Sequence, residues 1–217
     1  MSSIASMPMG IDVSKYQGNV NWGNVEAAGI SFAFARVSDG LNNPDPYFSQ
    51  NWSGMKNAGI LRGAYQYFRP TQSPKAQADL LISKLAQLQP GDLPPVLDVE
   101  TSDGASASQI LNGILLWQEE VEGAFERQII IYTARYFWQD SVNNSNQFAN
   151  RPLWVASYTN APAPSLPSAW PVWTFWQYTQ SGNVNGVNGS VDRNRFNGSM
   201  DGLRALAGYP PPAPTPE

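Results

Sequence analysis

The chain has 217 residues, 42% of them hydrophobic, and 13 Lys and Arg against 17 Asp and Glu, for a net charge of −4. The length and hydrophobic content predict one domain with a packed core, and the negative net charge argues against binding a polyanion such as nucleic acid. No apolar run reaches the roughly 20 residues that cross a bilayer. The chain contains neither His nor Cys, which excludes disulfides, Ser-His-Asp triads, cysteine nucleophiles and His/Cys zinc sites.

Seven mostly apolar runs predict β-strands, and a short eighth strand is expected near 191–192. The seven runs are 10–14, 32–37, 63–68, 95–100, 129–133, 153–158 and 173–178. The first six show little alternation between apolar and polar residues. This is typical of strands that are covered on both faces.

Helical patterns fill the gaps between the early strands. One helix is expected to begin at Ser73-Pro74, and a second after Ser106 or Ser108. Their apolar stripes are formed by Ala78, Leu81, Leu85 and Leu88, and by Ile110, Ile114, Trp117, Val121 and Phe125. Two shorter helices are expected to end at Gly29 and Gly59, each just before a strand.

The alternation of strands and helices predicts an α/β domain with a largely parallel sheet, and eight strands favour a closed barrel. Residues 154–196 are rich in Pro, Asn and Gly and show no amphipathic helix, so we expect loops to connect the last strands. We expect residues 1–207 to form a single domain and residues 208–217 a proline-rich, flexible tail. Residues 1–10 show no secretory signal, so the export route is not predicted.

Asp98 and Glu100 are the sharpest local signal for chemistry. Separated by two positions on a predicted strand, both side chains point to one face, roughly 7 Å apart at the backbone. They lie at the carboxyl end of the strand, where barrel enzymes place their catalytic groups. Two crowded carboxyls cannot both ionise freely, which favours an acid and a base side by side. The alternative is a structural pair that binds arginine or caps the next helix.

Asp12 and Asp192 occupy similar places on the first and last predicted strands. In a barrel these strands open on the same rim as Asp98 and Glu100, so the acids are expected to gather around one mouth, as in a glycosidase. Alternatively, Asp12 caps a turn and Asp192 pairs with a nearby arginine. A Mg²⁺ or Ca²⁺ site is a competing use of the same oxygen ligands.

Aromatic residues mark many of the other strand ends. Aromatic rings suit the C–H faces of a sugar. The predicted saccharide-binding residues are Tyr65, Tyr67, Tyr132, Trp154, Tyr158, Trp176 and the neighbouring Gln177. Core packing is the alternative role for each of the rings.

Five motifs follow one another along the chain. They are Asp12-Val13-Ser14-Lys15-Tyr16-Gln17-Gly18, Val96-Leu97-Asp98-Val99-Glu100, Leu153-Trp154-Val155-Ala156, Trp173-Thr174-Phe175-Trp176-Gln177-Tyr178 and Val191-Asp192-Arg193-Asn194-Arg195-Phe196-Asn197-Gly198. In this order they resemble glycoside hydrolase family 25, the Chalaropsis-type lysozymes or N-acetylmuramidases, and the likeness is strongest to the actinobacterial muramidases. The resemblance covers residues 9 to 207.

The resemblance implies an irregular TIM-like (β/α)5β3 barrel that hydrolyses the β-1,4 bond between N-acetylmuramic acid and N-acetylglucosamine in peptidoglycan. It implies that Glu100 is the acid/base, with Asp98, Asp12 and Asp192 as the other acidic groups. Action on the cell wall, outside the cell or in the periplasm, is expected of a monomer without cofactor or metal. Where many relatives have His after Gly-Ala-Tyr, this chain has Gln66, so one substrate contact is expected to be lost.

Two other interpretations stay open from the sequence. The first is a catalytically silent barrel that binds peptidoglycan or another saccharide, which needs the aromatic rim but not the acids. The second is a metal-dependent hydrolase of peptide or acyl groups. For the muramidase that the resemblance implies, retention through the substrate's acetamido group is favoured over an inverting attack by water or a direct attack by an aspartate.

Overall fold

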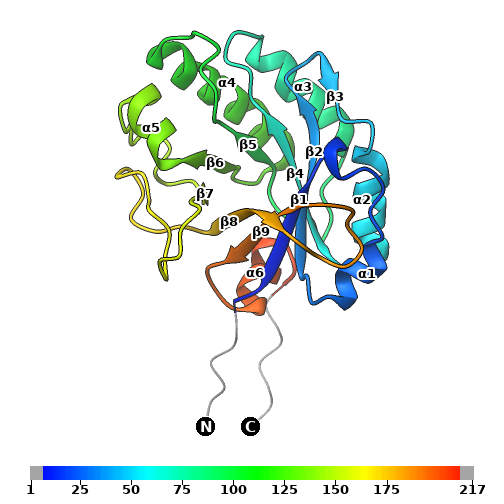
Figure 1. The fold of residues 1–217 in the computed structure, drawn as a ribbon. Helices are drawn as coiled ribbons and strands as arrows, with labels where there is room; N and C mark the ends of the chain where they lie inside the picture. Colours follow the sequence, from blue (N-terminus) through cyan, green and yellow to red (C-terminus); the bar gives the residue numbers. More distant parts are fainter. Residues whose placement is uncertain (1–6, 211–217) are drawn as a thin grey trace, which may run out of the picture.

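The computed structural model describes residues 7–210 (Figure 1). The strands are β1 (Met9–Val13), β2 (Phe32–Asp39), β3 (Asn43–Pro44), β4 (Leu61–Tyr67), β5 (Val96–Asp98), β6 (Ile130–Ala134), β7 (Leu153–Ala156), β8 (Phe175–Gly182) and β9 (Val191–Phe196). The α-helices are α1 (Trp22–Ala27), α2 (Phe48–Asn57), α3 (Pro74–Leu85), α4 (Ala107–Phe125), α5 (Arg135–Val142) and α6 (Met200–Leu206), with a 3-10 turn at Lys15–Gln17. None of the helices in this part of the chain is long and apolar enough to cross a membrane.

The sheet closes into a barrel because β1 pairs with both β2 and β9. Around the ring the strand order is β1, β9, β8, β7, β6, β5, β4 and β2, and β3 is a two-residue addition to β2. Neighbouring strands of the ring run parallel except at β9, which is antiparallel to both β8 and β1. The eighth predicted strand therefore exists, and it runs in the opposite direction to the other seven strands of the ring.

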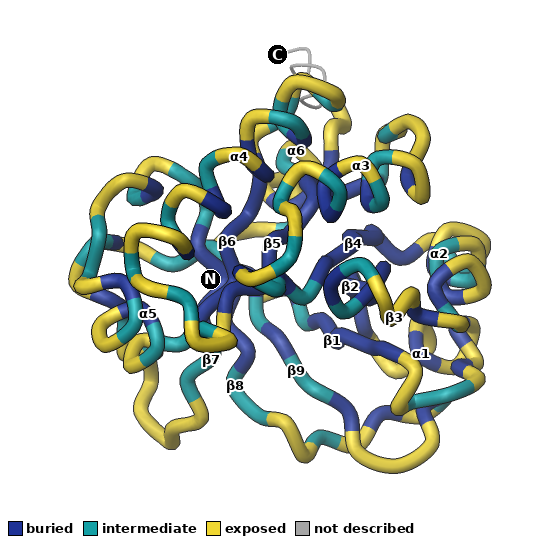
Figure 2. Tube along the Cα trace, turned by 90° about the horizontal axis from the view of Figure 1, so that it is seen from above, coloured by how far each residue is buried: buried dark blue, intermediate teal, exposed yellow. Residues whose placement is uncertain are grey.

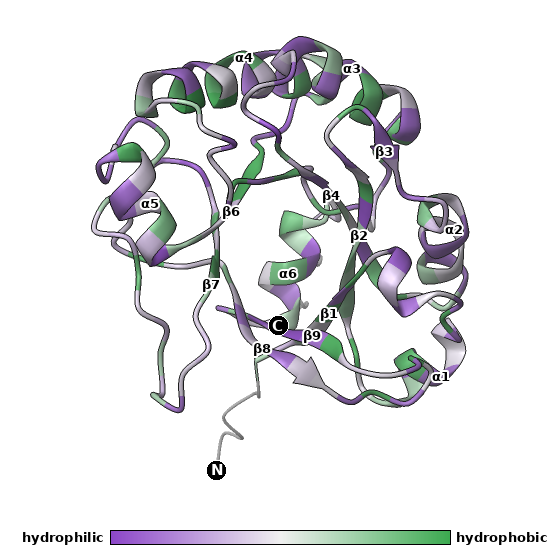
Figure 3. Ribbon diagram, turned by 45° about the horizontal axis from the view of Figure 1, so that its top comes forward, coloured by the Kyte–Doolittle hydropathy of each residue, from purple (hydrophilic) through white to green (hydrophobic). Residues whose placement is uncertain are grey.

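Helices α1 to α5 alternate with the strands up to β7, whereas loops alone join β7, β8 and β9 in the described chain. Figures 1 and 3 show helices α1 to α5 around the outside of the ring, and only loops between strands β7, β8 and β9. This is the (β/α)5β3 arrangement, so the irregular TIM-like barrel that the sequence predicts is confirmed.

The predicted helix boundaries have clear local causes. The Ser73 hydroxyl accepts a hydrogen bond from the backbone N–H of Ala76, and Ser106, rather than Ser108, caps α4 through a capping box with Gln109. The short helices end at Gly29 and Gly59, whose φ angles of 84° and 75° lie in the left-handed region.

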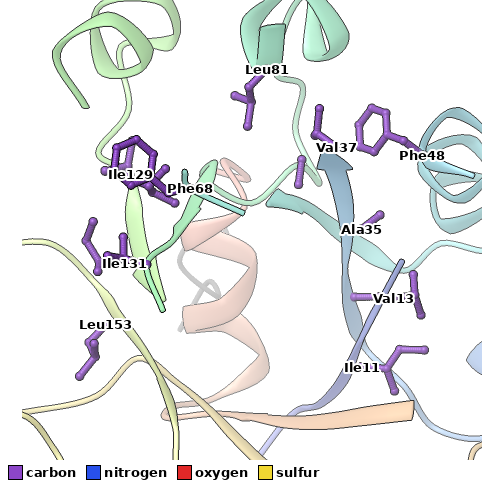
Figure 4. Packing of buried hydrophobic residues seen from close by; sticks show 14 of the residues in the cluster. Ile11, Val13, Ala35, Val37, Phe48, Phe68, Leu81, Ile129, Ile131 and Leu153 are labelled. Carbon is purple, nitrogen blue, oxygen red and sulfur yellow. The ribbon is translucent and has the colours of Figure 1, made fainter. Parts of the chain in front are cut away.

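Two apolar layers hold the barrel together. The outer layer lies between strands and helices, and Figure 4 shows part of it, with Phe48 of α2 and Leu81 of α3 toward Val37 at the end of β2. The inner layer fills the barrel with aromatic rings such as Phe32, Phe34 and Phe175. From above, Figure 2 shows the strands as the buried part of the trace and the connecting turns as the exposed part.

Helix α6 closes the amino-terminal end of the barrel. Its buried Leu203, together with Ala207, belongs to the inner apolar layer, and Figure 3 shows the helix within the ring of strands. The guanidinium of Arg127 donates hydrogen bonds to the backbone oxygens of Leu206 and Asp92 and so ties this helix to the barrel. Only the carboxyl end of the parallel strands is therefore left open. Residues 211–217 of the predicted tail lie outside the described residues.

Two glycines make room for the rings inside the barrel. Gly10 pairs in register with Phe32, and Gly63 with Phe34, on the strands that flank β2. A Cβ atom at Gly10 would lie 2.3 Å from the Phe32 ring, and one at Gly63 would lie 2.2 Å from the Phe34 ring. Small residues beside large ones let the interior of a small barrel fill without voids.

We therefore expect Gly63→Ala to lower the free energy of unfolding by about 1–3 kcal/mol, because the fully buried Phe34 ring has little space to move. Chemical denaturation measures this change. The matched control is Gly123→Ala on the exposed face of α4, where an added Cβ has no neighbour within 4 Å. That variant is expected to gain about 0.5–1 kcal/mol, and equal effects of the two substitutions would contradict the packing explanation.

Candidate active site

A cleft of about 420 Å³ opens at the carboxyl end of the parallel strands. The four predicted acids all line it: Asp12 ends β1, Asp98 ends β5, Glu100 follows two residues later, and Asp192 lies near the start of β9. Because β9 runs antiparallel, its first residues reach the rim where the other strands end. The structure thus brings together four side chains that lie up to 180 residues apart in the chain.

Asp12 and Asp192 face each other directly across the β1–β9 pair. Like charges at such positions repel. Burial raises the pKa of Asp12 well above the usual aspartate range, and the charge of Asp192 raises it further. Burial also raises the pKa of Asp192, while its hydrogen bond with Asp12 acts in the opposite direction. The pair therefore favours one shared proton, carried on the Asp12 side.

Amide side chains fix the orientation of the Asp12 carboxyl. Oδ2 of Asp12 accepts hydrogen bonds from Nε2 of Gln177 at 2.9 Å and from Nδ2 of Asn194 at 2.8 Å. The Gln177 oxygen in turn accepts from the hydroxyls of Tyr132 and Tyr158. With one oxygen held by two donors, the other oxygen of Asp12 is the one available to Asp192 or a ligand.

The segment after β5 carries the second pair of acids. The backbone continues along β6 for one more residue, because the Val99 N–H donates to the Tyr132 oxygen and the Thr133 hydroxyl donates to the Val99 oxygen. Asp98 is almost fully buried, whereas Glu100 lies at the solvent-accessible mouth. This places one carboxyl deep in the cleft and the other at its entrance.

The pKa values of both carboxyls are raised. For Asp98 the pKa lies well above the usual range, first through burial and then through the charges of Glu100 and Asp12. The cleft walls partly desolvate the Glu100 carboxyl and so raise its pKa, with the charge of Asp192 acting in the same direction. Oδ1 of Asp98 is buried and accepts no hydrogen bond from the described residues, so it is an acceptor that a ligand can use.

Two arginines that the sequence interpretation missed also line the cleft. Arg69 forms ion pairs with Asp39 at 2.5 Å and with Asp103 at 3.0 Å, which tethers the loop that carries Glu100 to the end of β2. Arg36 pairs with Asp45, 3.2 Å away. A charged residue within the otherwise apolar run 32–37 was the one signal that pointed to Arg36.

Five of the predicted aromatic residues line the cleft: Tyr65, Tyr67, Tyr132, Trp154 and Tyr158. Trp154 forms part of the floor. Its ring stacks on Phe34 with the centroids 4.4 Å apart, and its indole N–H donates to Asn194. The floor is therefore rigid and connected to the Asp12 network, while Tyr158, half exposed, stands at the edge.

The structure places two residues differently from the sequence interpretation. Trp176 does not line the cleft: its neighbour Gln177 faces inward, so Trp176 faces outward, and its indole N–H donates to the Ser157 oxygen. Gln66 likewise faces away from the cleft, where it is fully buried between Ser38 and Trp117 and hydrogen-bonded to both. Gln66 therefore makes core contacts in this chain and does not reach the cleft.

Across residues 7–210, no group of three or more acidic side chains is arranged to hold a metal ion. The arrangement that is present, two pairs of carboxyls with raised pKa values among aromatic rings, provides proton donors and acceptors beside surfaces that suit a sugar.

The raised pKa values predict how stability changes with pH. Asp12 and Asp98 keep a proton in the folded state at pH values where the unfolded chain, with aspartate pKa values of about 4, has lost it. The folded state therefore binds more protons, and the free energy of unfolding should rise as the pH falls from neutral toward about 4. Thermal unfolding at about pH 7.5 and pH 5 tests this.

Asp98→Asn should raise Tm at neutral pH and reduce the gain on acidification, because it removes one of these groups. Asp140→Asn, on the exposed face of α5, is the matched control and should follow the unmodified protein. If lowering the pH from about 7.5 to about 5 lowers the Tm of the unmodified protein, the raised pKa values of Asp12 and Asp98 are contradicted.

Comparison with known proteins agrees with this geometry. Residues 11–187 match the family described as glycosyl hydrolases family 25. Lysozyme M1 of Streptomyces globisporus is 41% identical over 91% of this chain and 70% of its own length, and the N,O-diacetylmuramidase of Chalaropsis sp is 32% identical over 91% and 98%. The crystal structure of a lysozyme from Streptomyces coelicolor superposes with a TM-score of 0.89, at 41% identity and over 93% and 97% of the two chains. The chain belongs to glycosyl hydrolases family 25.

Proposed function

We propose that this protein is a lysozyme, a 1,4-β-N-acetylmuramidase that hydrolyses the bond between N-acetylmuramic acid and N-acetylglucosamine in bacterial peptidoglycan. The observation that carries the proposal is the juxtaposition of Asp98 and Glu100 in a cleft lined by tyrosines and Trp154. The lysozymes and muramidases among its relatives support the same activity. Its partners are the glycan strands of the cell wall, where it acts.

Glu100 is proposed to be the general acid and then the general base. Its raised pKa keeps a proton on the carboxyl at mildly acidic pH, and its place at the mouth lets it reach the glycosidic oxygen of a bound strand. After the leaving sugar departs, the same carboxylate can deprotonate the incoming water. Arg69 lowers this pKa and tethers the neighbouring loop, so it acts as a positioning residue.

Asp98 is proposed to orient the 2-acetamido group of the muramic acid. The buried Oδ1 atom has no partner among the described residues and can accept the acetamido N–H. Holding that N–H directs the acetamido oxygen toward the anomeric carbon. When Glu100 carries the proton, its charge no longer raises the pKa of Asp98, so Asp98 can ionise and stabilise the positive charge that develops at the sugar. Asp12 and Asp192 are proposed to support this pair and the substrate. The reaction would then proceed with retention of configuration.

An inverting attack by water and a direct attack by an aspartate are the alternative mechanisms. Anomeric NMR of the first products distinguishes retention from inversion. We expect the β-anomer to appear first and the α-anomer to follow only through mutarotation. Prompt appearance of the α-anomer would overturn the retaining mechanism while leaving the muramidase activity intact.

A barrel that binds saccharide without cleaving it would need the aromatic rings but not the carboxyls. In this chain Asp98 is buried at a cost in solvation, Glu100 stands beside it at the mouth, and the pKa values of both carboxyls are raised. Such an arrangement favours catalysis over binding alone. We further propose that residues 1–207 work as one catalytic domain and as a monomer, with residues 208–217 as a tail.

Glu100→Gln is expected to leave a folded protein with a rate roughly 10²- to 10⁴-fold lower, because an amide cannot supply the proton. Its Tm should equal or exceed that of the unmodified protein, since one of several crowded carboxyls is gone. Mass spectrometry of digested peptidoglycan measures the activity and should find muramic acid at the new reducing ends.

The matched control is Glu119→Gln on the exposed face of α4, which should keep full activity. Asp98→Asn should be severely impaired, whereas Asp12→Asn and Asp192→Asn should lose less. New reducing ends of glucosamine, or a Glu100→Gln protein that digests walls at a normal rate, would refute the assignment.

A further inference from the structure

A second pocket of about 700 Å³ lies on the side of the barrel where no helix covers the last strands. We call it the Arg195 pocket. It is bordered by Tyr158, the loop 159–162, Trp176, Tyr178 and Arg195. The side chains of Trp176, Tyr178 and Arg195 face outward from β8 and β9, on the opposite face from Gln177, which lines the catalytic cleft.

Arg195 is held in place by aromatic rings and not by an acid. It lies directly opposite Trp176 in the β8–β9 pair, and its guanidinium carbon is 5.2 Å from the Trp176 ring centroid and 4.6 Å from that of Tyr178. Within residues 7–210 it forms no ion pair. Stacked arginines present planar donors that suit a carboxylate.

Arg193 adds a second positive charge beside the pocket. Its guanidinium carbon lies 5.9 Å from the Tyr178 ring centroid, and its Nε atom is buried without a partner in the described chain. Neither Arg193 nor Arg195 forms an ion pair within the described part of the chain. The pocket is therefore suited to an anionic ligand with an uncharged body that can lie against the rings.

Tyr158 connects this pocket to the catalytic cleft. Its ring borders both, and its hydroxyl donates to Gln177 at 2.7 Å, which fixes the ring at the boundary. Half of the side chain is exposed. A branch of a ligand bound in the cleft can therefore pass over Tyr158 and enter the Arg195 pocket without crossing the protein interior.

The charges of the two sites are complementary in sign. The cleft holds four carboxyls, and its own arginines, Arg36 and Arg69, are already paired with aspartates. A negatively charged branch of the substrate is repelled there. The outward face of β9 offers the opposite charge on the other side of Tyr158.

We propose that the Arg195 pocket binds a carboxylate of the peptide arm attached to muramic acid, while the glycan strand lies in the cleft. This inference rests on the proposed function. It gives the enzyme a preference for glycan strands that carry peptides. The cleft binds the sugar chain, and the outward face of β8 and β9 binds the acidic peptide.

The test compares peptide-bearing glycan strands with strands from which an amidase has removed the peptides, both free of other wall polymers. Arg195→Gln should lower kcat/KM on peptide-bearing strands about tenfold, mainly through KM, and should change it far less on peptide-free strands. The matched control is Arg204→Gln, which removes the charge of an exposed arginine on α6 at the closed end of the barrel. It should leave kcat/KM unchanged for both substrates.

Equal effects of Arg195→Gln on both substrates, or no effect on either, would overturn the peptide site while leaving the muramidase assignment in place. Failure of the unmodified protein to release muramic acid ends from both substrates would overturn the proposed function and this inference with it. A second measurement needs no variant: added salt should raise KM more for peptide-bearing than for peptide-free strands. Equal salt dependence would also overturn the peptide site.

Discussion

The reversed direction of β9 is the constraint on which the rest of the structure depends. Because this strand runs against both neighbours, its inward residues descend from the open rim to the closed end: Asp192 in the cleft, Asn194 beneath it, and Phe196 among the inner rings. Its outward residues, Arg193 and Arg195, carry positive charge to the uncovered side. A parallel strand in this place would reverse this order along the barrel axis and would need a long crossover connection in place of the short loop between β8 and β9.

Crowding four carboxyls at one mouth is unfavourable for the folded state, and the surrounding residues show how this cost is offset. Two side-chain amides donate hydrogen bonds to the Asp12 carboxyl. The charge of Arg36 lowers the pKa of Asp98, and the charge of Arg69 lowers that of Glu100. The rigid aromatic floor and the glycines that accommodate it prevent the acids from moving apart. The remaining cost lies at the substrate site, where the buried Oδ1 of Asp98 accepts no hydrogen bond from residues 7–210.

Most of the barrel could be predicted from the sequence because apolar runs, serine caps and left-handed glycines report on local structure. The four acids could also be placed on one rim, since strand order and strand ends decide their position. The two residues placed differently follow from the two-residue alternation of a strand. Gln177 faces the cleft, so its neighbour Trp176 faces outward, and Gln66 faces away from the cleft because the tyrosines on either side of it line the cleft. Helix α5 was missed because only Trp138 and Val142 mark its buried face.

The closed end of the barrel has a practical consequence. Residues near both ends of the described chain lie beside α6, as the hydrogen bonds from Phe196 to Pro8 and from Gly91 to Ala207 indicate, and Figure 1 shows both ends on that side. The cleft opens in the opposite direction. A surface, a label or a second protein joined at either end would thus lie on the side of the barrel opposite the cleft. The cleft would stay accessible to an insoluble, sheet-like substrate.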